Sequence, residues 1–423
     1  MKKKIDLIVS GISELVTLAG AQSPRRGSAE MNQLNIINDG AIAIKGDKIV
    51  ALSGTGDIIA KYSAWKIIKA QGKTVTPGLI DAHTHPIFMG DRADEFEMKI
   101  KGATYMEIAA AGGGIKSTVR KVRQASKENL KKNAGQYLKR FLACGTTTLE
   151  AKSGYGLTLA DEIKMLEAIK EINASVRVRP KIGPTLIPTF LGAHEIPDEY
   201  KDNESGYVDL IINQMLPAIA QKKLAQFCDV FCEKGVFEID DSRRILKSAL
   251  AHSFQIKLHA DEFVTLGGAE LGAELSAVSA DHLMFASDKG LAQMKEKGVI
   301  AVLLPGTTFM LGLKTYAPAR KMIEMGVPIA LATDFNPGTS MTESLPIIMT
   351  IACAMMRMTP AEALTAVTIN AAHAVKKADT IGSLEPGKKA DLVIWDTPSY
   401  KHIAYHFGIN LVEAVIKNGK RVI

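Results

Sequence analysis

Five side chains in the sequence have the types and positions needed to bind a metal ion and activate water. His83 and His85 form an H-x-H pair near the end of an expected strand. Residues two apart in a strand point to the same side, so both imidazoles can face one ion. The remaining three, far along the chain, are His259, His282 and Asp334. Three imidazoles and a carboxylate around an open position are typical of a catalytic metal site that keeps a water ligand.

The elements that carry these residues predict a (β/α)8 barrel. From residue 76 to residue 379, short apolar segments alternate with amphipathic helical segments. The expected strands are 77–85, 146–152, 181–190, 228–233, 255–262, 280–285, 299–305 and 328–335. All five candidate side chains fall near the C-terminal ends of their strands, where residues distant in sequence converge in this fold. An open doubly wound sheet is the competing architecture, but no glycine-rich phosphate-binding turn follows the first strand.

Both ends of the chain have a different texture, in which strand-like segments are separated by glycine and aspartate turns. Residues 1–75 contain IDLIVSG, ELVTLAG and GAIAIKGDKIVALSG, and residues 380–423 contain GSLEPGKKADLVIWD and VEAVIKNGKRVI. Such punctuation favours hairpins. We therefore expect an α/β chain in which 1–75 and 380–423 build one small β-sandwich domain, and 76–379 build the catalytic TIM barrel.

Composition excludes several classes of protein. The 423 residues are 47% hydrophobic and 23% charged, as in globular chains, and the net charge of +7 is spread thinly. Aromatic residues make up 6%. The sequence has no stripe of basic residues interleaved with aromatic ones, so it does not indicate a nucleic-acid-binding protein. Four cysteines are too few for a disulfide framework. Asp6 and Glu14 interrupt the N-terminal apolar run, so neither a leader peptide nor a membrane span is predicted, and we expect a cytoplasmic protein.

Longer motifs carry a resemblance to a known family. PGLIDAHTH, HADE, ATDFNPG and GSLEPGKKADLVIWD resemble segments of the metal-dependent amidohydrolase superfamily. TTTLEAKSGYGL, PTFLGAHEIP and TDFNPGTSMTESLPIIM are similar to the imidazolonepropionase family within it. The resemblance runs from about residue 35 to the C-terminus. It implies a hydrolase of carbon–nitrogen bonds that opens the cyclic amide of 4-imidazolone-5-propanoate to N-formimidoyl-L-glutamate in histidine degradation.

The resemblance also implies site residues. It places one metal ion, zinc or iron, on His83, His85, His259 and Asp334. One ion is favoured because two-metal members carry a bridging lysine at the end of strand four, and the segment CEKG offers no clear equivalent. His and carboxylate ligands do not discriminate between zinc and iron. The implied substrate contacts are Arg92, Tyr155, His194, Glu262, Asn336, Gly338 and Thr339.

These residue types suit an anionic ring substrate. Arg92 offers a bidentate fork to a propanoate tail. Tyr155 stands between two glycines, and we expect it on a mobile loop over the mouth of the barrel. A bound ion lowers the pKa of water toward neutrality, Asp334 is placed to accept the water proton, and either Glu262 or His282 passes it to the leaving nitrogen.

Two alternatives remain open at this point. An aminohydrolase of the cytosine or guanine deaminase type uses a similar H-x-H, His-x-x-Glu and late Asp, but it has no need of the carboxylate-binding set centred on Arg92. A non-enzymatic amidohydrolase-like scaffold is a rival from another class, although such proteins typically lose metal ligands. A homodimer is implied by the resemblance alone.

Overall fold

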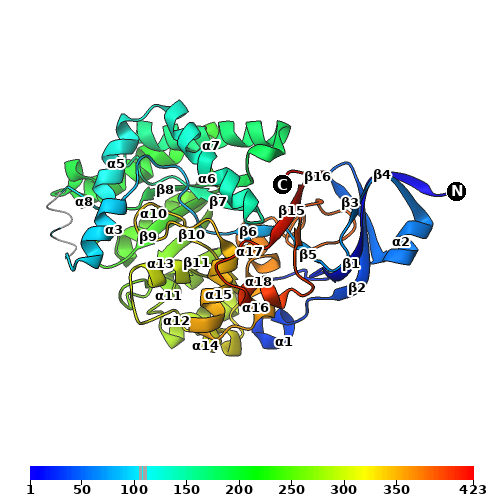
Figure 1. The fold of residues 1–423 in the computed structure, drawn as a ribbon. Coiled ribbons are helices and arrows are strands. Elements are labelled where there is room, and N and C mark those ends of the chain that lie inside the picture. The colour runs from blue at the N-terminus through cyan, green and yellow to red at the C-terminus, as the bar shows by residue number, and fades with distance from the viewer. Residues whose placement is uncertain (104–106, 108–111) are drawn as a thin grey trace.

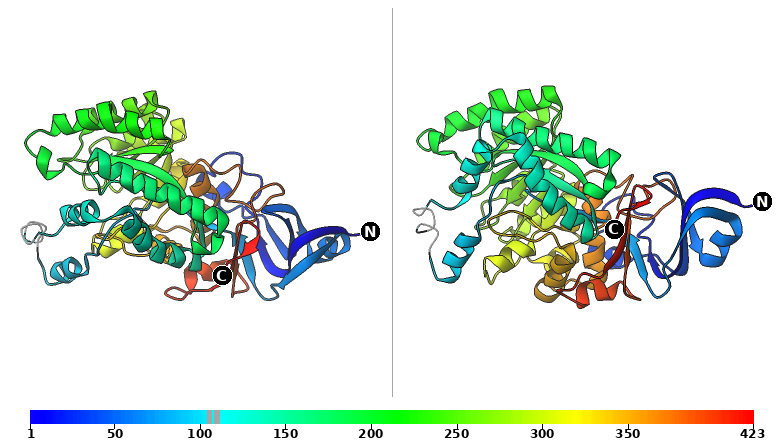
Figure 2. Two further views of the ribbon diagram at one scale, coloured as in Figure 1. Left: turned by 90° about the horizontal axis from the view of Figure 1, so that it is seen from above. Right: turned by 45° about the horizontal axis from the view of Figure 1, so that its top comes forward.

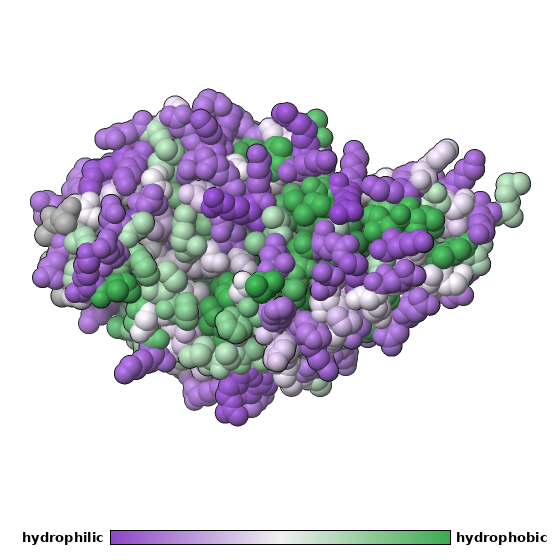
Figure 3. Space-filling model, in the orientation of Figure 1, coloured by the Kyte–Doolittle hydropathy of each residue, from purple (hydrophilic) through white to green (hydrophobic). Residues whose placement is uncertain are grey.

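The computed structural model describes residues 1–103, 107 and 112–423, and it consists of a barrel and a smaller β domain. The barrel occupies the left of Figure 1, and the β domain, which contains the strands nearest both chain ends, lies at the right. Of the helices described, none has both the length and the apolar character that crossing a membrane requires. Figure 3 shows polar side chains over most of one face, with apolar areas near the junction of the two parts.

Eight parallel strands form the barrel in their sequence order. They are β6 (Leu79–Asp81), β7 (Thr146–Lys152), β8 (Thr185–Ala193), β9 (Phe227–Cys232), β10 (Gln255–Ala260), β11 (Ser279–His282), β12 (Ile300–Leu303) and β13 (Ile329–Leu331). The first and last strands meet through a parallel bridge between Thr84 and Phe335. The predicted barrel is therefore confirmed, although several strands are shorter than expected.

Helices surround the barrel, as both views in Figure 2 show. They are α3 (Ala93–Ile100), α5 (Ile115–Gln124), α6 (Lys127–Ala143), α7 (Leu159–Val178), α8 (Glu204–Leu210), α9 (Leu216–Lys222), α10 (Ile239–Ala251), α11 (Gly268–Glu274), α12 (Asp288–Lys297), α13 (Pro305–Met310), α14 (Ala319–Met325), α15 (Leu345–Met356), α16 (Pro360–Ala366) and α17 (Ile369–Ala374). Short 3-10 turns lie at Pro180–Ile182 and Asp198–Tyr200, and a π-helical turn at Ile211–Met215 joins α8 to α9.

Helix α7 illustrates how the sequence specifies these elements. The Thr158 side chain accepts a hydrogen bond from the backbone N–H of Asp161 and so caps the first turn. Met165, Ile169 and Ile172 recur at helical spacing, and all three are buried in the barrel core. One polar residue of the first turn, Glu162, is also fully buried, and its role is described below.

Strands from both chain ends form one mixed sheet in the β domain. Its strands are β1 (Lys3–Val16), β2 (Ile36–Lys45), β3 (Lys48–Gly54), β4 (Tyr62–Lys69), β5 (Thr74–Pro77), β14 (Leu392–Trp395), β15 (Val412–Lys417) and β16 (Lys420–Arg421). The order is β16-β15-β14-β5-β1-β2-β3, and β4 pairs with β1. The predicted β domain built from both termini is thus confirmed. Within the described residues there are three further short helices, α1 (Gly27–Met31), α2 (Thr55–Lys61) and α18 (Lys401–Tyr405).

One N-terminal segment leaves this sheet and packs on the barrel. Met31 and Leu34 are buried in the same apolar cluster as the barrel helices. The Arg25 guanidinium donates to the carbonyl oxygens of Leu18 and Ala19, and its backbone N–H donates to Asn370 Oδ1 at 2.8 Å. A strand-only interpretation of the first 75 residues was therefore wrong here, because the apolar side chains of this helical segment are buried by the barrel rather than by the sheet.

Candidate metal centre

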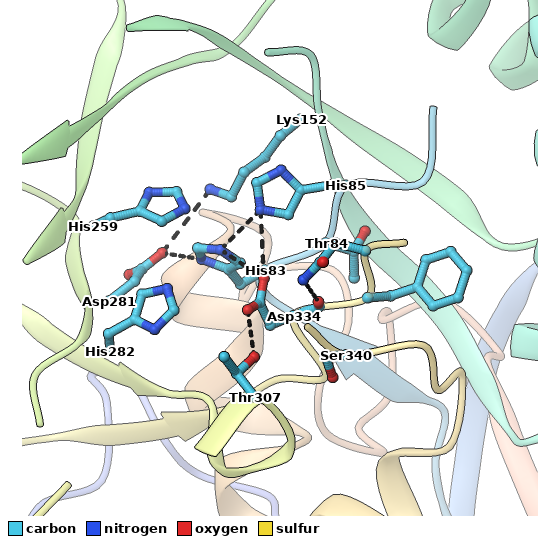
Figure 4. A network of polar contacts seen from close by, with 12 residues as sticks. His83, Thr84, His85, Lys152, His259, Asp281, His282, Thr307, Asp334 and Ser340 are labelled. Carbon is cyan, nitrogen blue, oxygen red and sulfur yellow. Dashed lines mark hydrogen bonds and ion pairs between the residues drawn. The ribbon is translucent and has the colours of Figure 1, made fainter. Parts of the chain in front are cut away.

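The segments that follow the first and last barrel strands, β6 and β13, bring three of the predicted ligands together. The Nε2 atoms of His83 and His85 lie 3.3 Å apart, and Asp334 Oδ1 lies 3.5 Å and 3.4 Å from them. Figure 4 shows the three side chains converging. The backbone N–H of Asp334 donates to the carbonyl of His83 at 3.1 Å, so the closure of the barrel sets their register. All three are buried.

The remaining imidazoles complete the cluster. The ring centroids of His83 and His259 are 4.5 Å apart. Nitrogen atoms of His83, His259 and His282 lie within 4.8 Å of one another. Imidazole nitrogens and one carboxylate oxygen are the donors that zinc and iron accept, so the residues present fit the ion that the sequence implies. His83 belongs both to this group of three histidines and to the group that it forms with His85 and Asp334.

The backbone of the centre is strained. Asp334 has a φ of 52° and His282 a φ of 75°, in the left-handed region that L-residues seldom adopt. Each such residue costs of order 1–3 kcal/mol, and such strain gathers at active sites. Thr307 Oγ1 donates to Asp334 Oδ2 at 2.5 Å and fixes the carboxylate, a contact that the sequence did not reveal.

Glu262 and His282 face each other beside the cluster. Glu262 Oε2 lies 3.5 Å from His282 Nε2. Burial, with the Asp334 and Glu233 carboxylates adding to it, raises the pKa of Glu262 well above its ordinary value. Burial lowers the pKa of His282 to about 3. The two shifts favour the neutral form of each group, and the contact places Glu262 and His282 within reach of a proton exchange.

The cluster opens into a cavity of about 490 Å³. Its walls carry most of the predicted substrate contacts together with the ligands. The predicted residues that line it are His85, Arg92, Tyr155, His194, His259, Glu262, His282, Asp334, Asn336 and Thr339. Other lining residues, which the sequence interpretation did not single out for substrate, are Ile115, Glu195, Phe231, Glu233, Lys234, Val236 and Phe263. The structure thus brings nearly the whole predicted set to one chamber.

Arg92 is held in place rather than solvated. Its Nε donates to Glu95 Oε2 at 2.8 Å, and Glu95 Oε1 accepts the backbone N–H of Gly114 at 3.1 Å. The guanidinium also lies against Gly338, where an added Cβ would come within 2.1 Å of Arg92 Nη1. Gly338 therefore does not line the cavity but leaves room for the arginine that does.

Tyr155 and His194 form another part of the cavity wall. The His194 ring stacks on that of His85 at a centroid distance of 5.1 Å, and its Nδ1 lies 2.9 Å from the carbonyl of Gly154. Tyr155 is 3% exposed. Its segment is tied to α7, because Glu162 accepts backbone N–H groups from Gly154, Gly156 and Leu157. The expectation of a loose loop over the mouth is not met, because these bonds anchor the segment.

Replacing Glu162 with alanine is expected to weaken substrate binding as well as folding. The change leaves three backbone N–H groups of the Tyr155 segment without their acceptor, at a cost of about 1–3 kcal/mol in the free energy of unfolding. KM should rise because Tyr155 and the carbonyl that orients His194 both shift. Urea unfolding and steady-state kinetics measure the two effects. Glu167→Ala, on the same helix and paired with Lys127, is the matched control. Wild-type KM in Glu162→Ala would contradict this role.

The segment after strand eight is a turn built by Asn336. Asn336 Oδ1 accepts the backbone N–H groups of Gly338 and Thr339, both at 2.8 Å. Its Nδ2 donates to the carbonyl of Asp334 at 2.7 Å and to Thr339 Oγ1 at 2.9 Å. Most hydrogen-bonding groups of the Asn336 side chain therefore stabilise the turn beside Asp334. The residue also lines the cavity.

A group of fully buried charged residues, the buried charge cluster, lies next to the imidazoles. Its members are Glu150, Lys152, Asp229, Lys257 and Asp281. Burial would lower the pKa of Lys152, but the carboxylates of Asp229, Glu150 and Asp281 outweigh it and raise that pKa. Oxygen atoms of Glu150 and Asp281 lie near a His83 nitrogen in a geometry that could suit an ion. Lys152 and Lys257 lie within 4.0 Å of both of these carboxylates, so we interpret the group as an ion-pair cluster.

Comparison with known proteins decides the family. The chain is 51% identical to an imidazolonepropionase of Alkaliphilus oremlandii over 422 residues, which cover 99% of this chain and 98% of that protein. The chain belongs to the imidazolonepropionase family. An imidazolonepropionase of Geobacillus thermodenitrificans is also 51% identical, with 99% and 98% covered. The model of the amidohydrolase family matches residues 241–422.

Solved structures support the fold of this imidazolonepropionase family member. An adenosine deaminase from Xanthomonas campestris with bound zinc has a TM-score of 0.69 at 17% identity, covering 100% of this chain and 93% of that one. A variant of atrazine chlorohydrolase from Arthrobacter aurescens, complexed with zinc and atraton, has a TM-score of 0.72 at 14% identity, with 98% and 94% covered. At these identities the likeness concerns the fold, which hosts several reactions.

Proposed function

We propose that this chain hydrolyses the cyclic amide of 4-imidazolone-5-propanoate to N-formimidoyl-L-glutamate, the imidazolonepropionase reaction of histidine degradation. The observation that carries the proposal is one cavity lined both by His85, His259 and Asp334, with His83 grouped behind them, and by the anchored guanidinium of Arg92. A metal centre alone would serve any hydrolase of this fold. The cation beside it selects a substrate with a carboxylate tail.

Binding follows from the walls of the cavity. The Arg92 fork, whose Nε is taken by Glu95, turns its remaining N–H groups toward the propanoate. His194 Nδ1 donates to the carbonyl of Gly154, which leaves Nε2 for the ring of the substrate. Tyr155, Asn336 and Thr339 close the same chamber around the polar edge of the ring.

We assign proton transfer to the carboxyl groups of Asp334 and Glu262 and to the imidazole of His282. When bound on His83, His85, His259 and Asp334, zinc or iron supplies Lewis acidity toward water and the ring carbonyl. Asp334 accepts the proton of the attacking water. The pair of Glu262 and His282, 3.5 Å apart, delivers a proton to the ring nitrogen that leaves as the amide bond breaks. The paired geometry supports a relay through both groups.

The test is a direct comparison of substrates. Protein loaded with zinc or iron is incubated with 4-imidazolone-5-propanoate, and the loss of ring absorbance is followed. Parallel reactions with cytosine and guanine are assayed for ammonia. Turnover of the imidazolone without ammonia from the bases supports the proposal. Ammonia release from a base, with no turnover of the imidazolone, would establish a deaminase instead.

Three finer statements belong to the same proposal. We infer one ion per subunit, a cytoplasmic location and a homodimer. The first is supported by the segment CEKG, whose Lys234 is exposed at the mouth rather than placed between ligands. The second is supported by the proposed role in histidine degradation. The dimer follows from the family resemblance, and sedimentation equilibrium tests it.

A further inference from the structure

The buried charge cluster consists of five charged residues, whereas the core of a barrel can be built from apolar residues alone. Its members come from β7, β9, β10 and β11, and all are fully buried. Burying ions is costly, and well-packed apolar residues of similar volume often serve stability as well or better. A barrel core is normally filled by branched apolar side chains. The cluster therefore points to a task beyond packing.

Two carboxylates of the cluster contact metal-ligand imidazoles. Asp281 Oδ2 lies 2.6 Å from His83 Nδ1, and Asp229 Oδ1 lies 3.2 Å from His259 Nδ1. A carboxylate accepts hydrogen bonds, so each Nδ1 carries the proton and each Nε2 keeps its lone pair. That is the tautomer in which both imidazoles can bind an ion through Nε2. Figure 4 shows Asp281 between His83 and Lys152.

The two lysines lie beside these carboxylates, and Asp281 Oδ2 is 3.7 Å from Lys257 Nζ and 4.0 Å from Lys152 Nζ. Lys152 Nζ donates to Asp229 Oδ2 at 2.5 Å and lies 3.0 Å from Glu150 Oε2. Lys257 Nζ also lies 3.0 Å from Glu150 Oε2, and it donates to the carbonyl of Ala82 at 2.8 Å. Ala82 directly precedes His83. Without the ammonium groups, three carboxylates in one dry site would repel one another and draw away from the imidazoles.

We propose that Lys152 and Lys257 are positioning residues of the metal centre. They fix Asp229 and Asp281, which in turn fix the tautomer and the direction of His259 and His83. Neither lysine is among the residues that line the cavity. The inference rests on the proposed metal-dependent function, and its test separates the two: wild-type protein that binds no ion contradicts that function, whereas variants that bind the ion as wild type does contradict only the inference.

The experiment compares zinc affinity in Lys152→Met and in a matched control. The dissociation constant is measured by competition with a chromogenic chelator, using full-length protein. Removing such support for a ligand typically weakens metal binding by about 10–100-fold, and we expect this for Lys152→Met. Lys417→Met is the control, because Lys417 is equally buried and its Nζ lies 2.8 Å from Asp391 Oδ2 in the β domain. Its affinity should remain at the wild-type value.

A second variant and a spectroscopic readout complete the design. Asp281→Asn removes one charge at nearly constant volume and should weaken zinc binding in the same range, so it decides the question alone if Lys152→Met does not fold. Nitrogen-15 spectra of labelled histidine in the chelated protein should show loss of the fixed Nδ1–H tautomer in both variants. Unchanged zinc affinity in every folded variant of the cluster, or equal weakening in Lys417→Met, would overturn the proposal.

Discussion

Asp334→Asn is expected to lower kcat by about 10²–10⁴-fold, the range that a general base contributes. The substitution keeps the shape of the side chain but removes both a charged metal ligand and the group that accepts the water proton. Burial would raise the pKa of Asp334, but the hydrogen bonds with His85 and with Thr307 act against it, and that pKa lies below its ordinary value. The wild-type carboxylate is therefore ready as a base at neutral pH.

The measurement combines steady-state kinetics with metal analysis of the purified variant. The three imidazoles that remain should retain some metal, so a loss of kcat per bound ion isolates the role of the base. Asp396→Asn makes the same chemical change at an exposed position of the β domain and should leave kcat unaltered. A metal-loaded Asp334→Asn protein with wild-type kcat would contradict the assignment of Asp334.

Arg92→Met is expected to raise KM for 4-imidazolone-5-propanoate by about 10–100-fold, with a smaller change in kcat. A hydrogen bond to a charged group contributes roughly 1.5–3 kcal/mol, and Arg92 supplies it to the tail rather than to the reacting bond. Arg92→Lys should recover only part of the loss, because an ammonium group cannot bind Glu95 and a carboxylate in the geometry of the fork. Gly338→Ala should raise KM as well, since its Cβ would displace the guanidinium.

A truncated ring provides the control for Arg92. With a substrate analogue that lacks the propanoate, wild-type protein and Arg92→Met should have the same kcat/KM, because the group that Arg92 binds is absent. Arg140→Met removes a largely exposed arginine and should leave kcat/KM unchanged for both the substrate and the truncated analogue. Equal losses for the substrate and the truncated analogue in Arg92→Met would show that the arginine supports structure and does not bind the tail.

Sequence patterns were sufficient to predict the architecture and the convergence of the candidate metal ligands. Alternating strand and helix periods predicted the barrel, and the position of each histidine at a strand end predicted its convergence on one face. The ligands could be found because His and Asp are rare in strands that are otherwise apolar. Arg92 could be found through the family motif, although nothing in the sequence indicated the Glu95 contact that orients it.

Other parts of the site depend on the closed barrel. Lys152, Lys257 and Asp229 are charged residues in apolar strands, which was a usable signal. Their pairing, however, requires the closed barrel, in which side chains from β7, β9 and β10 meet in the interior. The contact between Asp334 and Thr307 joins the segment after β13 to helix α13, which no local pattern connects. In the sequence, Glu162 cannot be distinguished from an ordinary acidic residue in the first turn of a helix. Its burial, and with it the anchored Tyr155 segment, becomes apparent only once α7 has packed.

Titration of the chelated protein with zinc or iron tests the central claim most directly. The claim is that one ion, held by His83, His85, His259 and Asp334, supports hydrolysis of the imidazolone ring. Turnover of 4-imidazolone-5-propanoate, measured as each portion of metal is added, should rise linearly and reach its plateau at one equivalent per chain. A plateau at two equivalents would contradict the single-ion centre. Full turnover in metal-free protein would contradict the metal-dependent mechanism itself.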